Sequence, residues 1–176
     1  FVIFLPSVGK RESKDYNIII ISATNIGANH LGTYGYERDT SPNIDALAKE
    51  SLVFDNFFAP ASWTLPTGIS LFTSLYPYQH GVMVRLLDRR GVPTERLNPK
   101  IMTLIDLLKD NGYVTGAFTG RFDYRPSFGL TNRFDVYTSS QENTNSKDTK
   151  IKFVEDRRFG HMADVVLDAS EWIDQN

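Results

Sequence analysis

The sequence of 176 residues contains no cysteine. Disulfide bonds, thiolate metal sites and a cysteine nucleophile are therefore excluded. An excess of charge of one sign is also missing, because 19 Lys and Arg residues are balanced by 21 Asp and Glu residues, giving a formal net charge of −2. This balance gives no reason to expect nucleic acid as a partner.

Long apolar runs are missing as well. Residues 1–6 are apolar but far too short to span a bilayer, and no other run approaches that length. We interpret residues 1–15 as a lead-in whose apolar start is either the remnant of a signal peptide or anchor, or a short strand. The composition of the chain, 41% hydrophobic and 23% charged, is that of an ordinary globular domain with one core.

Residues 16–21 (YNIIII) give the first strong structural signal. A β-branched run without alternation predicts a strand buried on both faces, as in a parallel sheet covered by helices. Ligands of such sheets bind beyond the carboxyl ends of the strands, so residues 22–25 become candidate site residues. Residues 53–58 are rich in aromatic side chains and end before Pro60, which predicts a second strand.

Apolar spacing predicts several amphipathic helices. One begins after Ser41, a suitable N-cap, with Pro42 at its first position. Its buried stripe is expected to contain Ile44, Leu47, Ala48 and Leu52. Another is marked by apolar residues between 101 and 108, stops at Asn111–Gly112, and leads into a strand over 113–120. This order of helix, glycine and strand is typical of an α/β unit.

Two predictions concern the end of the chain. Residues 138–150 are rich in polar side chains and are expected to form a surface loop. Residues 162–173 follow as a further amphipathic helix. Because no strand follows that helix, we expect the sheet to be incomplete at the C-terminus.

The segment 62–77 is predicted to be a loop that turns into a helix, since Pro66 suits the first turn. The inward face of this helix is expected to hold Ile69, Phe72 and Thr73. Thr64 is then expected just before the helix N-terminus, where free N–H groups and the macrodipole favour an anion. A nucleophile that attacks a sulfate or phosphate ester needs such a setting.

These motifs resemble those of the sulfatase family. TLPTG at 64–68, followed by TSLYP at 73–77, is similar to the family's Cys/Ser-x-Pro-Ser/Thr-Arg motif and the Thr-Gly-x-Tyr-Pro that ends its helix. LGTYGY at 31–36 and TSPNIDALA at 40–48 resemble two further family blocks. The resemblance extends from residue 16 nearly to the end of the chain.

The resemblance implies an α/β, alkaline-phosphatase-like fold, in which a sheet is sandwiched between helices. For intact members it also implies hydrolysis of sulfate esters at a formylglycine made from Cys or Ser, with a bound Ca²⁺ or Mg²⁺. It favours an extracytoplasmic location, and a sulfated or phosphorylated small molecule or glycan as the partner.

Several family positions are occupied by other residues. Thr64 stands at the position of the nucleophile, and threonine cannot yield formylglycine because its β-carbon carries a methyl group. Gly68 replaces the arginine of the motif. Thr24 and Asn25 replace two metal-binding carboxylates with neutral oxygens, so we expect no resident cofactor in this chain.

Residues 120–123 (GRFD) match a family segment, Gly-Lys-x-His, whose Lys and His contact the sulfate. Arg121 keeps a cation suited to an oxyanion, which makes it a candidate substrate-binding and catalytic residue. Asp123 replaces a proton donor with an anion. The family's remaining metal ligands belong to a later segment that these 176 residues do not include.

Three hypotheses follow. The favoured one is the N-terminal part of a sulfatase domain with a degenerate site and little or no turnover. The second is an ester hydrolase or transferase that uses Thr64 directly as the nucleophile. The third is a non-catalytic module that binds a sulfated or phosphorylated glycan.

Overall fold

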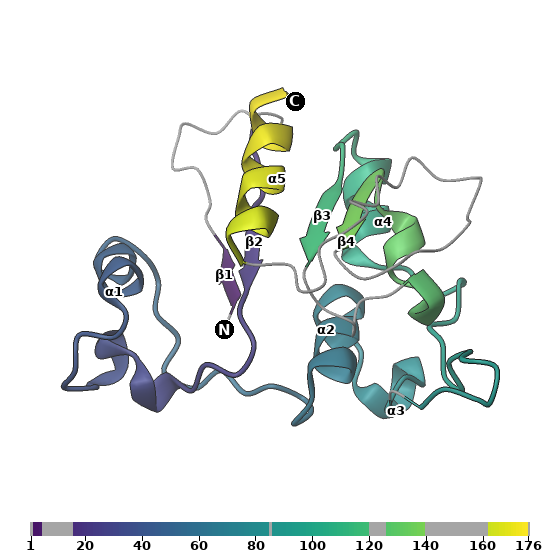
Figure 1. The fold of residues 1–176 in the computed structure, drawn as a ribbon, viewed down its shortest axis with the longest axis horizontal. Helices are drawn as coiled ribbons and strands as arrows, with labels where there is room; N and C mark the ends of the chain where they lie inside the picture. Colours follow the sequence, from purple (N-terminus) through teal and green to yellow (C-terminus); the bar gives the residue numbers. More distant parts are fainter. Residues whose placement is uncertain (1, 5–15, 85, 120–125, 140–161, 176) are drawn as a thin grey trace. The chain divides into compact units, whose positions relative to one another are not determined.

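The computed structural model describes residues 2–4, 16–84, 86–119, 126–139 and 162–175, and these form a mixed α/β chain (Figure 1). They belong to two compact units, residues 1–58 and 59–176, each of which is described by itself. Within these ranges, no helix combines the length and apolar character that crossing a membrane requires.

The first unit contains two short strands, β1 (Val2–Phe4) and β2 (Ile20–Ser22), which pair in antiparallel fashion. The strand predicted for residues 16–21 is confirmed only at its end, because β2 begins at Ile20. Its predicted burial on both faces is wrong, because Ile18, Ile19 and Ile21 are 38–53% exposed. The β-branched pattern assumes a central strand of a parallel sheet, whereas the described part of this unit gives β2 only one antiparallel neighbour.

Helix α1 (Pro42–Ala48) begins with a proline at its first position, as predicted. Two 3₁₀ turns precede it, η1 (Ala28–His30) and η2 (Gly32–Tyr34). Asp45 of α1 accepts hydrogen bonds from the backbone N–H and the hydroxyl of Thr33, both at 2.7 Å. These bonds fasten α1 to the turn that carries the LGTYGY motif.

Two predictions for the following segment are wrong. Leu52 was expected on the buried stripe of α1 but is 89% exposed, because the helix ends four residues earlier at Ala48. Residues 53–58 were expected to form a strand, but the structure gives them a turn and irregular backbone. Aromatic residues favour strands only where a neighbouring strand is available, and none pairs with this segment in the described residues.

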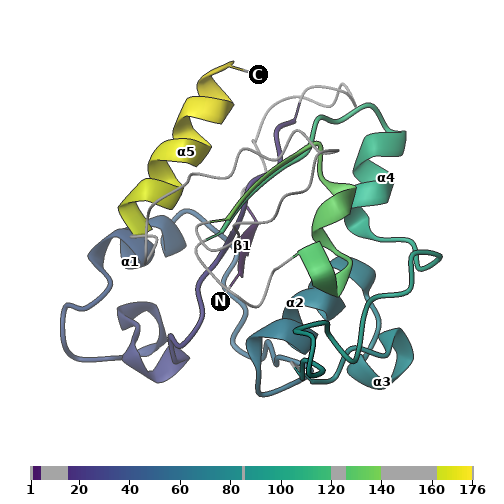
Figure 2. The ribbon, with the colours of Figure 1, turned by 45° about the vertical axis from the view of Figure 1, so that its right-hand side comes forward.

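The second unit contains a parallel pair of strands, β3 (Gly116–Thr119) and β4 (Val136–Ser139). Helix α4 (Leu104–Asp110) precedes β3, and Gly112 ends it with a left-handed φ of +84°. This confirms the predicted order of helix, glycine and strand. Helix α5 (Met162–Gln175) was also predicted, and in Figure 2 it lies on one side of the strands while α4 lies on the other.

The core of the second unit joins α2 (Thr64–Thr73) to α4 and to the turns before β4. Its fully buried members are Leu65, Ile69, Val82, Leu97, Ile105, Phe128 and Leu130. Phe72 packs against this cluster and meets the ring of Phe134 edge to face, with 5.9 Å between centroids. The predicted inward face of α2 is confirmed, and its packing fixes where the helix begins.

Candidate functional site

The start of α2 is the part of the second unit that the sequence singled out. Thr64 is the first residue of the helix and is half-buried, after Trp63 in an extended conformation at the N-cap. Pro66 has no N–H, and the N–H of Thr67 contacts the Trp63 carbonyl at 3.4 Å. Among the described residues, the N–H groups of Thr64 and Leu65 have no backbone partner, and an anion is favoured at such a helix end.

The loop before α2 is closed by the hydroxyl of Thr67, which donates to the carbonyl of Ala61 at 2.9 Å. The structure places Thr67 in the first turn of α2, where its hydroxyl serves as a donor to this carbonyl. The hydrogen bond holds the segment in front of Thr64 in a fixed loop.

His80 packs against α2 and contacts Ser70 of that helix. It lies on α3 (Pro77–His80), is 3% exposed, and places Nε2 3.1 Å from Oγ of Ser70. The N–H of Val82 donates to Nδ1 at 3.1 Å, so a neutral ring carries its proton on Nε2. Burial lowers the pKa of His80, although the carbonyl of Pro66 and the charge of Glu95 act in the opposite direction. These contacts give His80 a structural role in holding α2.

The Thr64 hydroxyl has no activating partner nearby. Within the described residues of the second unit, no hydrogen bond joins it to a carboxylate or to a histidine, and His80 is engaged with Ser70 and Val82. Gly68, at the position of the motif arginine, is buried in α2 and offers no side chain. This helix end can hold an anion, but these residues supply no general base.

Thr24 and Asn25 follow β2 in the first unit. Thr24 is half-buried, and Asn25 is exposed with a left-handed φ of +62°, a conformation that Asn adopts more readily than most residues. Both offer neutral oxygens, whereas a divalent cation prefers carboxylates. Among the described residues no group of three or more His, Cys, Asp or Glu side chains could hold a metal ion. Thr24 and Asn25 therefore offer a cation neutral oxygens, without the carboxylates that Ca²⁺ or Mg²⁺ prefers.

The predicted site residues fall in different parts of the chain. Thr24 and Asn25 belong to the first unit and Thr64 to the second, so their arrangement along one rim stays a prediction. Arg121 and Asp123 lie outside the described residues.

The sequence reasoning missed the ionic contacts of the second unit. Asp106 of α4 accepts from the backbone N–H and hydroxyl of Thr103, each at 2.8 Å, and from the Arg133 guanidinium. Asp135 forms an ion pair of 2.6 Å with Lys109. The spacing of Thr103 and Asp106 is that of a capping box, and this signal could have revealed the first half of the network.

Comparison with known proteins gives a consistent result. Residues 16–176 match the family described as Sulfatase. The chain is 35% identical over 113 residues to bovine arylsulfatase A, covering 62% of this chain and 21% of that protein. It is 31% identical over 137 residues to mouse arylsulfatase G, covering 73% of this chain and 24% of that protein.

A bacterial relative shows the same partial coverage. The N-acetylgalactosamine-6-O-sulfatase of Bacteroides thetaiotaomicron is 29% identical over 111 residues, which are 61% of this chain and 20% of that protein. The chain thus spans about a fifth to a quarter of the length of these curated relatives. The match over nearly the whole chain, together with the helix end that presents Thr64, shows that this protein belongs to the sulfatase family.

Proposed function

We propose that this chain is part of a sulfatase domain that has little or no sulfate ester turnover of its own. Family membership implies the alkaline-phosphatase-like fold and sulfate esters as the ligand class. The observation that carries the proposal is the setting of Thr64, at the first position of α2, where the described residues of the second unit supply no base and Gly68 stands at the position of the motif arginine. The anion-binding geometry is retained, while the reactive group is replaced.

Chemistry explains why turnover should be lost. Formylglycine needs a β-carbon with one heteroatom and no methyl group, and Thr64 does not meet that requirement. A threonine hydroxyl used directly would need a base or a metal ion to activate it. Loss of a single group that stabilises the transition state typically costs about 100-fold to 1,000-fold in rate, and several such positions are substituted here.

A second candidate function is supported by the same helix end. The unpaired N–H groups of Thr64 and Leu65, together with the partial exposure of Thr64, would suit a phosphate or sulfate ester attacked by the threonine hydroxyl. This reading requires an activating group that the described residues of the second unit do not supply.

Turnover assays on the 176-residue chain separate the two functions. We expect no hydrolysis of 4-nitrophenyl sulfate or 4-nitrophenyl phosphate above the level of a Thr64→Ala variant, with or without added Ca²⁺ or Mg²⁺. Hydrolysis that Thr64→Ala abolishes and Thr64→Ser preserves would overturn the proposal in favour of the threonine nucleophile.

A calorimetric titration tests the metal site directly. Because Thr24 and Asn25 carry no charge, we expect no tight binding of Ca²⁺, Mg²⁺ or Zn²⁺. Micromolar binding that a Thr24→Ala/Asn25→Ala variant loses would contradict the expected degeneracy. An extracytoplasmic location follows only from the family resemblance, and fractionation of the producing cells would test it.

A further inference from the structure

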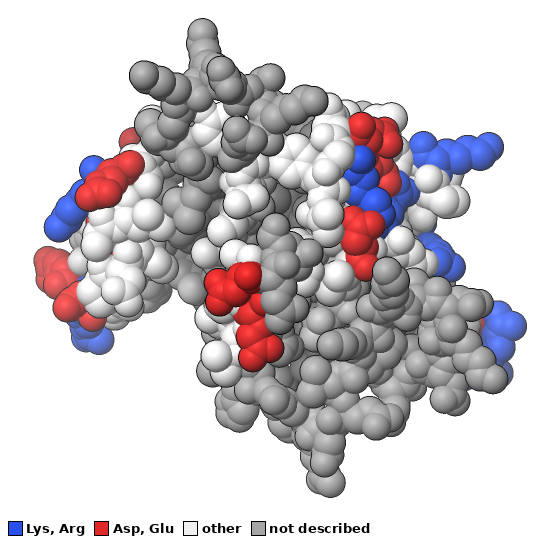
Figure 3. All heavy atoms as spheres, turned by 90° about the horizontal axis from the view of Figure 1, so that it is seen from above, with Lys and Arg blue, Asp and Glu red and all other residues white. Residues whose placement is uncertain are grey.

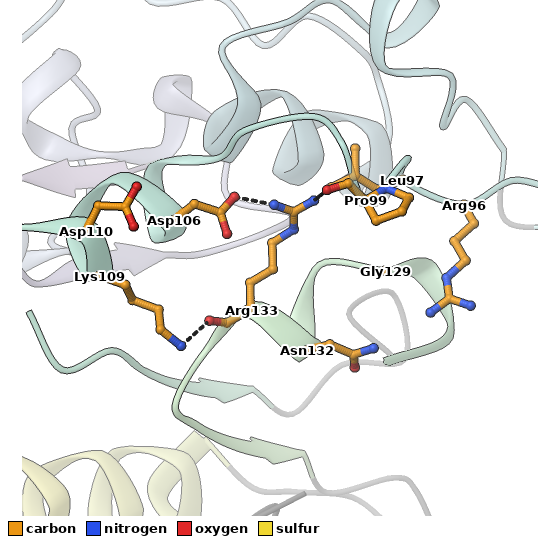
Figure 4. A pocket seen from close by; sticks show the side chains of 9 residues that line it. All are labelled: Arg96, Leu97, Pro99, Asp106, Lys109, Asp110, Gly129, Asn132 and Arg133. Atoms are coloured by element: carbon orange, nitrogen blue, oxygen red, sulfur yellow. Dashed lines mark hydrogen bonds and ion pairs between the residues drawn. The ribbon is translucent and has the colours of Figure 1, made fainter. Parts of the chain in front are cut away.

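The second unit contains a groove of about 670 Å³ that belongs to no family motif (Figure 4). Its walls come from residues 96–99, from α4, and from the turn over 129–133, and α2 contributes nothing to them. The volume lies within the range of about 300–1,000 Å³ that is usual for small-molecule sites. The groove is large enough for a ligand of monosaccharide size.

One end of the groove presents donors that are not engaged. Arg96 and Asn132 are exposed, and neither forms a hydrogen bond or an ion pair with the described residues. In Figure 4 their side chains point into the same end of the groove, on either side of the turn that carries Gly129. A guanidinium and an amide NH₂ at the same end of a groove each suit the oxygens of a carboxylate, sulfate or phosphate group.

The backbone that carries Arg96 is held in place. The next residue, Leu97, is 1% exposed, and its N–H donates to the carbonyl of Phe128 at 3.0 Å. Gly129 has a left-handed φ of +88°, and a Cβ there would lie 3.2 Å from Cγ and 3.3 Å from Nε of Arg96. The absent side chain of Gly129 leaves room for Arg96 to lie against the turn.

The middle of the groove is braced by cations that are already paired. Arg133 donates to Asp106 and to the carbonyl of Pro99, the latter at 3.2 Å. Lys109 binds Asp135 at 2.6 Å and the carbonyl of Arg133 at 3.1 Å. These contacts join the three walls before any ligand arrives, which lowers the conformational cost of binding.

The opposite end carries a negative charge. Asp110 is exposed and has no hydrogen bond or ion pair among the described residues, and Figure 4 shows it at the far end from Arg96. A carboxylate there repels a second anionic group but accepts hydrogen bonds from hydroxyl groups. On the face shown in Figure 3, the coloured acidic and basic side chains form separate small groups, and neither sign forms one broad patch. This charge pattern favours a ligand with one anionic group over a polyanion.

We propose that the groove binds a small hydroxyl-rich ligand with one anionic group, such as a singly sulfated or acidic monosaccharide. Arg96 and Asn132 hold the anionic group, and the hydroxyl groups extend toward Asp110. The proposal does not depend on turnover at Thr64, because the two sites share no residue.

The test is a titration of the 176-residue chain followed by the backbone amide signals in NMR spectra. The probes are galactose 6-sulfate, glucuronate and glucose 6-phosphate, with neutral galactose as the control. We expect saturable shifts at residues 96, 129 and 132 with at least one anionic probe and much weaker shifts with galactose. Comparison of the three anions identifies which group the site prefers.

Variants separate the groove from general charge attraction. Arg96→Ala should weaken binding about tenfold or more, the loss expected for a charge-assisted hydrogen bond. Arg89→Ala removes an exposed arginine outside the groove and should leave affinity unchanged. Absence of saturation with all three anions, shifts centred on α2, or equal losses in the Arg96 and Arg89 variants would each overturn the proposal.

Discussion

The guanidinium of Arg133 donates from Nη1 to Oδ2 of Asp106, the same oxygen that accepts the hydrogen bonds of Thr103. One carboxylate oxygen therefore caps α4 and also fastens it to the turn before β4. The Arg133 side chain is only 12% exposed. Burial acts to raise the pKa of Asp106, but the bonds from Thr103 and Arg133 together lower it.

Removing this charge should destabilise the second unit. We expect Asp106→Asn to lower the free energy of unfolding by about 1–3 kcal/mol, because a partly buried guanidinium loses its counter-charge. The matched control is Asp110→Asn, since Asp110 is exposed and unpaired among the described residues, and its effect should stay within about 0.5 kcal/mol. Chemical denaturation of both variants measures the difference. Equal effects would contradict a special role for the Asp106 pair.

The lowered pKa of Asp106 predicts part of the stability that the chain loses at acid pH. Since the pKa of Asp106 is lower in the folded state than its ordinary value of 3.8, the unfolded chain binds more protons at acid pH. The stabilisation is present above 3.8 and is lost as the pH falls through the lower folded pKa. We expect the Asp106→Asn variant to lose less stability on acidification than the parent. Some acid loss should remain, because the pKa of Asp135 is also lowered.

His80 should make stability depend on pH near neutrality. Burial lowers its pKa below the ordinary value of 6.5, so the unfolded chain takes up a proton that the folded chain resists. Stability is then greatest above 6.5 and declines as the pH falls through the lower folded pKa. We expect the Tm to drop between about pH 7.5 and about pH 5 in the parent chain.

Two variants check this assignment. His80→Gln should be less stable at neutral pH but should show a flatter dependence of Tm on pH, because no proton is taken up at residue 80. His30→Gln replaces an exposed histidine and should leave the slope unchanged. If Tm depends on pH as steeply in His80→Gln as in the parent chain, another group is responsible for the titration.

Local signals in the sequence predicted the helices of the second unit well. Pro66 and the apolar spacing after Thr64 placed the start of α2, and Gly112 placed the end of α4. These features act on N–H groups and backbone φ angles within a few residues of the chain. Their effect on where a helix begins and ends therefore does not depend on tertiary contacts.

Strand burial could not be predicted in the same way. The isoleucine run at 18–21 and the aromatic run at 53–58 state a preference for strands, but pairing and burial depend on neighbours that the run itself does not specify. The two candidate sites also differ in how far the sequence predicts them. The position of Thr64 follows from its motif, whereas the groove at Arg96 and Asn132 joins distant segments and carries no motif.

The contact between Gly32 and Asp45 offers a test within the first unit. A Cβ at Gly32 would lie 2.4 Å from Oδ2 of Asp45, so Gly32→Ala must displace that carboxylate. The hydrogen bonds from Thr33 to Asp45 should weaken, and the Thr33 amide should exchange with deuterium faster. Gly27→Ala is the control, because its nearest neighbour is the exposed side chain of Asn29, which can move away. Unchanged protection of Thr33 in Gly32→Ala would show that the turn accommodates the methyl group.

Two buried threonines should respond in opposite directions to the same substitution. Thr131 is 2% exposed, and its hydroxyl has no hydrogen-bond partner in the part of the chain that the structure describes, whereas the hydroxyl of Thr103 donates to Asp106 at 2.8 Å. Thr131→Val removes an unsatisfied polar atom at nearly constant shape and should raise the free energy of unfolding by about 1 kcal/mol. Thr103→Val removes a cap and should lower it by about 1–2 kcal/mol. Denaturant midpoints measured side by side decide the matter, and a loss of stability in both variants would mean that the Thr131 hydroxyl is satisfied in solution.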